Sequence, residues 1–357
     1  MSNQEKKILF LYTELAEYIL ACFKKLLDSG YQIVVIRYEV NSEAPFRFQV
    51  NKQLKLYDRK TLSFDKLNKI VSDFMPDVVF SSGWKDKDYL RLCKLFRLNG
   101  VKTILCMDNK WRLTPKKIIA SLVSNYFIKP CFDFAWVPGS LQAKYASKLG
   151  FKIHEIFKGF YTADTDFFSQ IIINSKYHTD NNFPKRFIYM GRYAESKGLN
   201  ELWVAFEKFS LIFPDWELLC IGTGNLQPIS HPRIKHLGFL QKDEMTSAIE
   251  KCGVFVLPSR NEPWGVVVHE MASCGFPLLL SDQVGASEDF LLEGQNGFSF
   301  KACDIESCFL ALCKIANLSS KKLFQMSNKS IENSKKNSVK IWVEKVDQIY
   351  NLSRNEK

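Results

Sequence analysis

The chain has 357 residues, of which 46% are hydrophobic and 14% aromatic, and its formal net charge is +11. This length and composition exclude an extensively disordered protein and are sufficient for two packed domains. No apolar run approaches the roughly 18 residues of a membrane-spanning helix, and residues 1–7 lead into the first apolar run without a signal peptide. We therefore expect a cytoplasmic protein.

Apolar runs alternate with helical patterns along the whole chain. Such alternation predicts an α/β fold in which parallel sheets are covered on both faces by helices. Residues 174–182 are polar and rich in turn formers, which is typical of a linker. The apolar runs, which we interpret as strands, include residues 8–12, 33–36, 77–80, 103–107, 186–190, 218–221, 253–257 and 278–280.

The positive charge lies in the N-terminal half. Residues 1–160 contain 27 Lys and Arg against 15 Asp and Glu, a net charge of +12, whereas the remainder has a net charge of −1. This excess indicates an anionic partner, such as a lipid diphosphate or the inner face of a membrane. Nucleic acid is not expected, because the chain has no nucleic-acid-binding motif and no basic platform with interleaved aromatic residues.

The segment 112–129 is the strongest candidate for contact with that partner. Its lysines, at positions 116, 117 and 129, flank an apolar and aromatic stripe, as in helices that lie in a membrane interface. The alternative is a helix that packs on its own sheet and leaves a solvated basic edge. The sequence leaves both interpretations open.

A cationic pair follows the strand expected at 186–190. Gly191-Arg192 comes directly after this run, and Lys197-Gly198 precedes an amphipathic segment that begins at Leu199. Arg binds phosphate oxygens in a bidentate manner, and Lys supplies a mobile point charge. The pair therefore offers the positive charge that a diphosphate needs.

Two carboxylates, Glu262 and Glu270, follow the strand expected at 253–257. We expect Pro263 at the first position of a helix, Glu262 near its N-cap and Glu270 about two turns along it. Ligands of open α/β sheets bind at this end of the strands, and a carboxylate is the usual partner of a ribose diol there. Each Glu alone could be a surface charge, but together with the cationic pair they indicate a nucleotide diphospho-sugar site.

The same residues resemble the C-terminal half of the retaining glycosyltransferases of family 4. The resemblance extends from residue 191 to residue 297 and includes Gly191-Arg192-x4-Lys197-Gly198, Gly222, Gly238 and Glu262-Pro263-Trp264-Gly265-x4-Glu270. It implies that Arg192 and Lys197 bind the donor diphosphate, that Glu262 contacts the transferred sugar and that Glu270 holds the ribose. Gly191, Gly222, Pro263, Trp264 and Gly265 would surround the donor.

The resemblance also implies an architecture and a reaction. The architecture is GT-B, with two Rossmann-like parallel-sheet domains that face a central cleft. A sugar would be transferred with retention from a UDP- or GDP-sugar to a glycan or a polyprenyl-diphosphate-linked glycan in cell-surface polysaccharide assembly, without metal or cofactor. We assign an acceptor-binding domain to 1–165, a linker to 166–184, a nucleotide-sugar-binding domain to 185–335, and to 336–357 a helix that packs back toward the N-terminal domain.

The N-terminal half departs from the family pattern. Many members have a Gly-Gly turn after the first strand, where this chain has Thr13-Glu14, and a histidine after a middle strand, where it has Asp108 and, three residues later, Trp111. A subset of polysaccharide-assembly members has the same residues at these points. We therefore regard Asp108 as a catalytic candidate and Thr13, Glu14 and Trp111 as acceptor candidates. The alternative for Asp108 is an N-cap of the next helix.

Other functions remain as alternatives or are disfavoured. A catalytically silent homologue that binds a sugar nucleotide or a lipid, and a GT-B sugar-nucleotide epimerase, are compatible with the same residues. A dehydrogenase is disfavoured because no Gly-x-Gly-x2-Gly follows the first strand, and a glycosidase because two carboxylates on one helix are poorly placed to flank a sugar. The ten cysteines and five histidines lack metal-ligand spacing, so neither a metal site nor a disulfide framework is expected.

Overall fold

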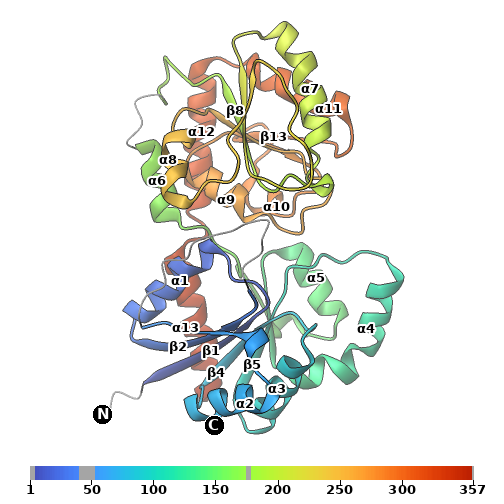
Figure 1. The fold of residues 1–357 in the computed structure, drawn as a ribbon, viewed down its shortest axis with the longest axis vertical. Coiled ribbons are helices and arrows are strands. Elements are labelled where there is room, and N and C mark those ends of the chain that lie inside the picture. Colours follow the sequence, from blue (N-terminus) through green and yellow to red (C-terminus); the bar gives the residue numbers. More distant parts are fainter. Residues whose placement is uncertain (1–4, 40–52, 174–177, 356–357) are drawn as a thin grey trace. The chain divides into compact units, whose positions relative to one another are not determined.

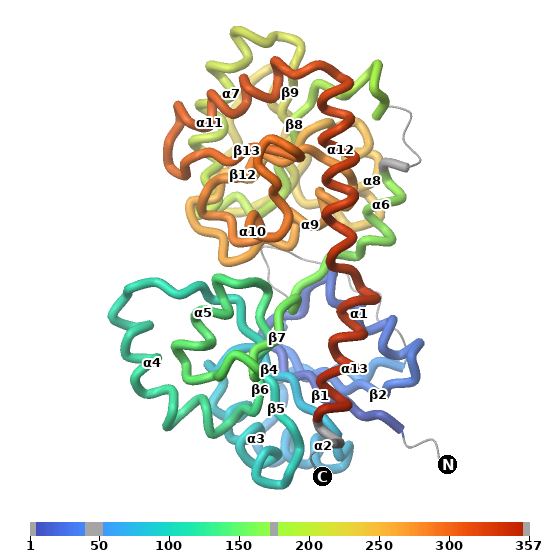
Figure 2. Tube along the Cα trace, turned by 180° about the vertical axis from the view of Figure 1, so that it is seen from behind, coloured from blue at the N-terminus to red at the C-terminus, as the bar shows by residue number. Residues whose placement is uncertain are grey.

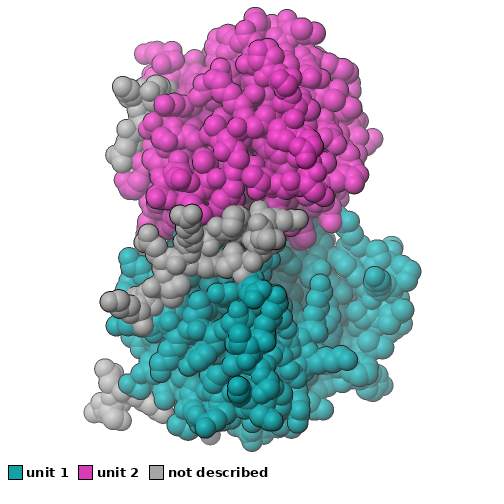
Figure 3. Space-filling view, viewed as in Figure 1, with its two compact units in different colours: residues 1–41, 46–162, 339–357 teal, residues 42–45, 163–338 magenta. Residues whose placement is uncertain are grey.

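The computed structural model describes residues 5–39, 53–173 and 178–355, and Figures 1 and 2 show them from two opposite sides. The chain divides into two compact units (Figure 3). Of the described residues, unit 1 contains 5–39, 53–162 and 339–355, and unit 2 contains 163–173 and 178–338. Each unit is a parallel sheet covered by helices, which confirms the predicted fold class of two Rossmann-like domains.

The described strands of unit 1 form one parallel sheet in the order β3-β2-β1-β4-β5-β6-β7. They are β1 (Lys6–Tyr12), β2 (Tyr31–Arg37), β3 (Lys55–Asp58), β4 (Val78–Ser82), β5 (Lys102–Cys106), β6 (Phe134–Val137) and β7 (Ile156–Lys158). Its helices and 3-10 turns are α1 (Glu17–Asp28), η1 (Arg59–Thr61), α2 (Phe64–Phe74), α3 (Lys87–Leu98), α4 (Pro115–Phe127), η2 (Lys129–Cys131), α5 (Ser140–Lys148), η3 (Ile153–Glu155) and α13 (Val339–Asn355). The strand order reverses direction between β1 and β4.

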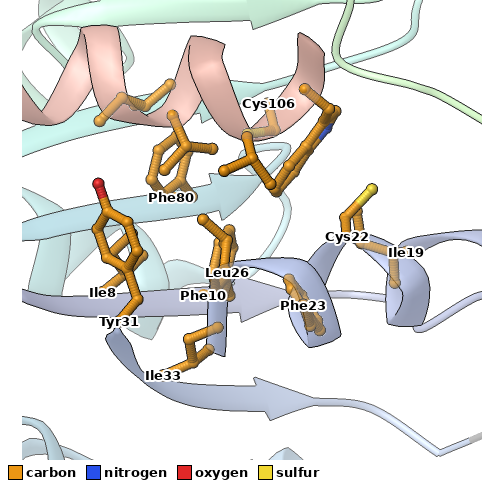
Figure 4. Packing of buried hydrophobic residues seen from close by; sticks show 14 of the residues in the cluster. Ile8, Phe10, Ile19, Cys22, Phe23, Leu26, Tyr31, Ile33, Phe80 and Cys106 are labelled. Atoms are coloured by element: carbon orange, nitrogen blue, oxygen red, sulfur yellow. The ribbon is translucent and has the colours of Figure 1, made fainter. Parts of the chain in front are cut away.

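Strand β1 shows why this sheet is buried on both faces. Ile8 and Phe10 belong to the core under α1 and α13, whereas Leu9 and Leu11 belong to the core under α2, α3 and α5, as the alternation of side chains along a strand requires. Figure 4 shows Phe10 and Phe80 in the first of these cores, where their rings stack with centroids 5.1 Å apart. Trp342 of α13 donates a hydrogen bond to the Phe160 carbonyl over 2.7 Å, which ties the end of the chain to unit 1.

The described strands of unit 2 form a parallel sheet in the order β10-β9-β8-β11-β12-β13. They are β8 (Arg186–Met190), β9 (Glu217–Ile221), β10 (Ile234–His236), β11 (Val254–Leu257), β12 (Leu278–Ser281) and β13 (Gly297–Phe300). The helices and the 3-10 turn are α6 (Thr165–Ile173), η4 (Glu195–Lys197), α7 (Leu199–Ile212), α8 (Lys242–Ile249), α9 (Val266–Ser273), α10 (Ser287–Phe290), α11 (Ile305–Ala316) and α12 (Ser320–Ser334). Here the strand order reverses direction between β8 and β11.

The range 166–184, expected to be a linker, begins inside a helix. Helix α6 belongs to unit 2 and packs against α9. Phe168 and Ile171, three positions apart, are buried on one face of this helix. Through these two side chains α6 contacts the core of unit 2. The polar composition of residues 174–182, from which a linker was predicted, does not indicate this contact. Residues 174–177 of the expected linker lie outside the described residues.

Three further observations concern the chemistry of the described residues. The ten cysteines are free thiols, and all except Cys303 and Cys313 are buried. Within the described ranges, no group of three or more His, Cys, Asp and Glu side chains is arranged to hold a metal ion. None of the helices in these ranges has the length and apolar character needed to cross a bilayer.

Candidate functional site

The loops that follow three neighbouring strands of unit 2 carry most of the predicted site residues. Gly191 and Arg192 follow β8, Gly222 follows β9, and Glu262 lies in the loop after β11. Because β9, β8 and β11 are adjacent and parallel, these loops leave the same edge of the sheet. They flank the point where the strand order reverses, which is where open α/β sheets bind ligands.

The glycines at this edge allow two loops to pack backbone against backbone. The Gly191 N–H donates to the Ile221 carbonyl over 3.0 Å, and the Gly222 N–H donates to the Gly238 carbonyl over 2.7 Å. Gly222 has a φ of 135°, and a Cβ atom there would lie 1.9 Å from the Gly191 carbonyl oxygen. Any side chain at this position would separate the loops. The loops after β8, β9 and β10 are therefore held together through their backbones.

Lys197 and Glu262 form an ion pair in which the lysine Nζ donates to the carboxylate Oε2. Their side chains are only 16% and 10% exposed. The Arg260 N–H donates to the Ser196 carbonyl over 2.9 Å, so the backbone also joins the two loops that carry the pair. A carboxylate this buried is stabilised by its partner, and removing either charge would leave the other uncompensated.

The predicted helix start at Pro263 is wrong. Helix α9 begins at Val266, and its N-cap is Gly265 in the left-handed conformation, with a φ of 93°. Glu262 is extended instead and forms a parallel bridge with Val284, in which the Gly285 N–H donates to the Glu262 carbonyl over 3.1 Å. This bridge to the loop after β12 delays the helix, so Glu270 lies about one turn along α9 rather than two.

Arg192 lies on the surface beside a buried tyrosine that the sequence analysis missed. The Tyr189 hydroxyl donates to the Arg192 carbonyl over 2.8 Å. Burial raises the pKa of Tyr189 well above its usual value; Glu262 adds to the rise, and Arg192 opposes it. The guanidinium and the carboxylate therefore act on the same hydroxyl. Tyr189 occupies an apolar strand two positions before Gly191, where nothing in the sequence marks it as a site residue.

Glu270 is surrounded by a different set of charges. Burial raises the pKa of Glu270 to about 7, with Lys242 opposing the rise and Asp164 adding to it. Lys242 at the start of α8 pairs with Asp164 over 2.6 Å, and its Nζ lies 4.6 Å from the centre of the Phe167 ring. Neither Lys242 nor Asp164 is predicted from the sequence as a site residue. A half-buried carboxyl group that titrates near neutrality suits hydrogen bonding to a hydroxyl-bearing ligand.

Trp264 and His269 are core residues. Trp264 is 2% exposed, and its indole packs against Phe290, so its side chain is part of the core. His269 Nδ1 accepts from the Ala163 N–H over 2.9 Å, and its Nε2 donates to the Ser334 carbonyl over 3.0 Å. Burial lowers the pKa of His269 to about 4, so its ring is neutral. Of the other predicted donor residues, Pro263 is half-buried.

In unit 1 the reversal point between β1 and β4 carries hydroxyl groups. The Thr13 N–H donates to Ser82 Oγ over 2.7 Å, and the two hydroxyl oxygens lie 3.0 Å apart. Thr13 and Glu14 are exposed after β1, and no glycine occurs at that turn. The turn after β1 therefore lacks the glycine that the turn after β8 has in unit 2.

Asp108 after β5 contacts a pair of tyrosines. The Tyr161 hydroxyl donates to Asp108 Oδ2 over 3.3 Å, and the rings of Tyr161 and Tyr18 meet edge to face at 5.5 Å. Burial raises the pKa of Tyr18, and the charges of Asp108 and Glu14 raise it further. The N-cap of the next helix is Thr114, so the alternative role of Asp108 as that N-cap is wrong. Neither tyrosine is predicted from the sequence as a site residue.

Trp111 lies in a different environment. It packs against Tyr145 of α5, with ring centroids 5.6 Å apart, in the core under α2, α3 and α5. Tyr18 and Tyr161 instead pack against the core under α1 and α13. The structure therefore groups Asp108 with Tyr18 and Tyr161, and Trp111 with Tyr145.

Comparisons with known proteins agree with these observations. Residues 172–337 match the family described as glycosyl transferases group 1. A stretch of 132 residues is 30% identical to glycogen synthase of Mycobacterium tuberculosis and covers 34% of this chain and 31% of that protein. Another of 136 residues is 32% identical to phosphatidyl-myo-inositol mannosyltransferase of Mycolicibacterium smegmatis and covers 36% and 35%. The chain thus matches about a third of the length of these relatives.

Solved structures resemble the chain over both units. Sucrose-phosphate synthase from Thermosynechococcus elongatus has a TM-score of 0.75 at 13% identity, and the match covers 99% of this chain and 100% of that one. Anabaena HepE in complex with UDP and glucose has a TM-score of 0.72 at 15% identity, covering 97% and 100%. At such identities the likeness shows the fold, which is GT-B.

Proposed function

We propose that this protein, which belongs to the group 1 glycosyltransferases through residues 172–337, transfers a sugar from a nucleotide diphospho-sugar to an acceptor hydroxyl. The observation that carries the proposal is the buried Lys197–Glu262 pair at the reversal point of the unit 2 sheet, with Arg192 beside it. The three side chains together have one net positive charge. They attract an anionic donor and keep one carboxylate within reach of its sugar.

Arg192 and Lys197 bind the diphosphate in this proposal. Negative charge grows on the diphosphate as the bond to the sugar breaks, so fixed positive groups stabilise the transition state more than the ground state. The N-cap of α9 is Gly265, which has no side chain, and the backbone N–H groups at this N-terminus add further positive potential. These groups neutralise the leaving diphosphate without a metal ion. Glu262, held by Lys197 and by its bridge to Val284, contacts the transferred sugar.

Glu270 binds the ribose of a UDP- or GDP-sugar. An ionised carboxylate accepts hydrogen bonds from both hydroxyls of a ribose diol. Its nearly neutral pKa and its separate neighbours, Lys242 and Asp164, support a role distinct from that of Glu262. Structures of Anabaena HepE with UDP and with UDP-glucose make UDP-sugars the first donors to test.

The acceptor is a glycan or a polyprenyl-diphosphate-linked glycan used in cell-surface polysaccharide assembly, and unit 1 binds it. The net charge of +12 within residues 1–160 supports an anionic acceptor at the inner face of a membrane. Asp108, with Tyr161 and Tyr18, orients the acceptor hydroxyl. The hydroxyl attacks the sugar from the face that the diphosphate leaves, so the anomeric configuration is retained.

A donor screen tests this function. We expect UDP- or GDP-sugars to raise the unfolding temperature of the wild type, because a ligand that binds only the native state stabilises it. Arg192→Ala should remove most of this shift, whereas Lys185→Ala, which alters an exposed pair with Asp215, should not. No shift with any UDP-, GDP- or dTDP-sugar would contradict the proposal.

Product analysis then separates the proposal from its alternatives. A transferase gives a product with retained anomeric configuration by NMR, at a rate that EDTA does not change. An epimerase releases free nucleotide without an acceptor, and a silent homologue shows the thermal shift without turnover.

A further inference from the structure

In helix α4 the distribution of large apolar side chains between buried and exposed positions is the reverse of that in a typical helix of a water-soluble domain. Among its residues Ser124 is buried, and its hydroxyl donates to the Leu149 carbonyl over 2.6 Å. Its large apolar side chains are exposed instead, whereas such residues normally face the core. We call these seven residues the α4 apolar face: Leu113 (83% exposed), Ile118 (40%), Ile119 (59%), Leu122 (70%), Val123 (37%), Tyr126 (78%) and Phe127 (66%).

The α4 apolar face is continuous and lies at one flank of unit 1. Positions 118, 119, 122, 123, 126 and 127 follow helical spacing and form one stripe. Figures 1 and 2 show α4 on the side of unit 1 opposite to α1 and α13. A stripe of exposed large side chains on one helix marks an interaction surface.

The charges around this face are positive. Residues 109–132 contain no Asp or Glu, and Lys116 at the first turn of α4 is exposed. Two of the three lysines that flank the stripe have partners within unit 1. Lys117 Nζ donates to the Lys110 carbonyl, and Lys129 pairs with Glu155 over 2.7 Å. Of the two lysines in α4, Lys116 is therefore the one whose side chain is exposed.

We propose that the α4 apolar face inserts into one leaflet of an anionic membrane, with Lys116 at the headgroups. An exposed apolar stripe with basic residues beside it, in a segment (109–132) that contains no Asp or Glu, is the pattern of helices that lie in a lipid interface. Tyr126 suits this boundary, because it has an apolar ring and a polar hydroxyl. This proposal adds a membrane contact to the proposed function. It rests on that function only in taking a membrane as the partner.

Charge complementarity favours lipid over a second copy of the chain. In a symmetric dimer the same patch meets itself. Such pairing through α4 would bring the basic residues of both copies together, with no acidic residue in 109–132 to compensate them. An anionic lipid surface instead offers an apolar layer for the stripe and negative headgroups for Lys116.

Vesicle co-sedimentation tests the apolar contribution. We compare the wild type, Ile119→Gln/Leu122→Gln and the control Leu211→Gln/Ile212→Gln, whose residues are 85% and 60% exposed on α7 of unit 2. With phosphatidylglycerol-containing vesicles, the α4 variant should bind at least about tenfold more weakly than the wild type, because it loses the transfer of two large side chains. The control should bind like the wild type.

A second pair of variants tests the charge. Lys116→Gln should weaken binding to the same vesicles by about fivefold, since one basic residue near an anionic surface contributes that much. Lys321→Gln, on the exposed start of α12 in unit 2, should leave binding unchanged. Neutral phosphatidylcholine vesicles should bind the wild type more weakly than anionic ones.

Three outcomes overturn the proposal: a wild type that stays in the supernatant, an α4 variant that binds like the wild type, or a dimer that the α4 variant converts to a monomer without any vesicle binding. The last would assign the face to self-association. Thermal shift by the nucleotide sugar is measured on the same samples. A protein that binds vesicles without binding donor would contradict the proposed function alone, and the reverse would contradict this inference alone.

Discussion

The carboxyl edges of the two sheets carry different side chains at equivalent positions. Between β8 and β11 unit 2 has Arg192 and the Lys197–Glu262 pair, with glycines that let the backbones approach each other. Between β1 and β4 unit 1 has hydroxyl groups, and Asp108 after β5 lies with the phenols of Tyr18 in α1 and Tyr161 after β7. A charged edge suits a diphosphate, and an edge of hydroxyls and phenols suits a hydroxyl-rich ligand. The two edges therefore match the two substrates of a sugar transfer.

The two edges also differ in how burial couples their site residues to the stability of the fold. The unit 2 pair is nearly buried, so each charge depends on the other. Arg192 is exposed, and the residues after β1 are exposed as well. Substitutions at the buried pair should thus change both folding and activity, whereas those at Arg192 should change activity alone.

The largest effect is expected for Lys197→Ala. Turnover should fall by about 10²–10³-fold, because a fixed positive group at the leaving diphosphate is lost. The free energy of unfolding should also fall, by about 3 kcal/mol, because Glu262 is left as an uncompensated buried charge. Arg192→Ala should lower turnover as well but change stability by less than about 0.5 kcal/mol. Steady-state kinetics and denaturant unfolding of both variants measure these changes.

The double variant Lys197→Ala/Glu262→Gln separates folding from chemistry. It should recover much of the lost stability, since the buried negative charge is gone, and none of the turnover. Turnover near that of the wild type in Lys197→Ala would remove the lysine from the mechanism and leave Arg192 as the cation proposed to bind the diphosphate.

The sequence predicts the charged edge better than the hydroxyl edge. Arg192, Lys197 and Glu262 stand directly after apolar runs, next to glycine and proline, so local signals mark them. The start of α9 was missed because it depends on a bridge between Glu262 and Val284, which lies beyond local sequence. The tyrosines beside Asp108 come from opposite ends of unit 1 and have no motif in common. Tertiary contacts of this kind leave no periodic signal.

Helix α4 shows another limit of sequence patterns. Its periodicity indicates an amphipathic helix, and both interpretations of residues 112–129 share that periodicity. What decides between them is which face is buried, and that depends on the space beneath the helix. Here Ser124 fits against the end of α5, and the larger side chains are left outside.

A moderate effect is expected for Asp108→Asn. Turnover should fall by about a hundredfold, in the range of lost general base or orienting groups, and Tyr161→Phe should lose about tenfold, the value of one hydrogen bond to a charged group. Affinity for the nucleotide sugar should stay unchanged in both, because these residues belong to unit 1. Asp73→Asn on the exposed surface of α2 is the control. Weaker donor binding in Asp108→Asn would break the division of labour between the edges.

The smallest effect is expected for Glu270→Gln, and it depends on pH. Because burial raises the pKa of Glu270 from 4.5 to about 7, the native state keeps a proton that the unfolded state releases. Its contribution to stability is therefore fully present below pH 4.5 and is lost as the pH rises through 7. Relative to Glu270→Gln, the wild type should lose about 2 kcal/mol of unfolding free energy across this window, allowing for solvent screening of a half-buried group.

Nucleotide affinity should change in the opposite direction. The ionised carboxylate is the better acceptor for a ribose diol, so UDP should bind the wild type up to about tenfold more tightly at pH 8 than at pH 6, the value of one charge-assisted hydrogen bond. Glu270→Gln should show a flat profile, whereas the exposed Asp243→Asn control on α8 should follow the wild type. His269, whose pKa is lowered to about 4, destabilises both proteins equally as the pH falls below 6.5, so its effect cancels in the difference. Calorimetric titration and thermal unfolding across this pH range measure both quantities. Parallel profiles for the wild type and Glu270→Gln would show that a different group titrates with the nucleotide, and would leave Glu262 as the carboxylate of unit 2 that acts on the donor.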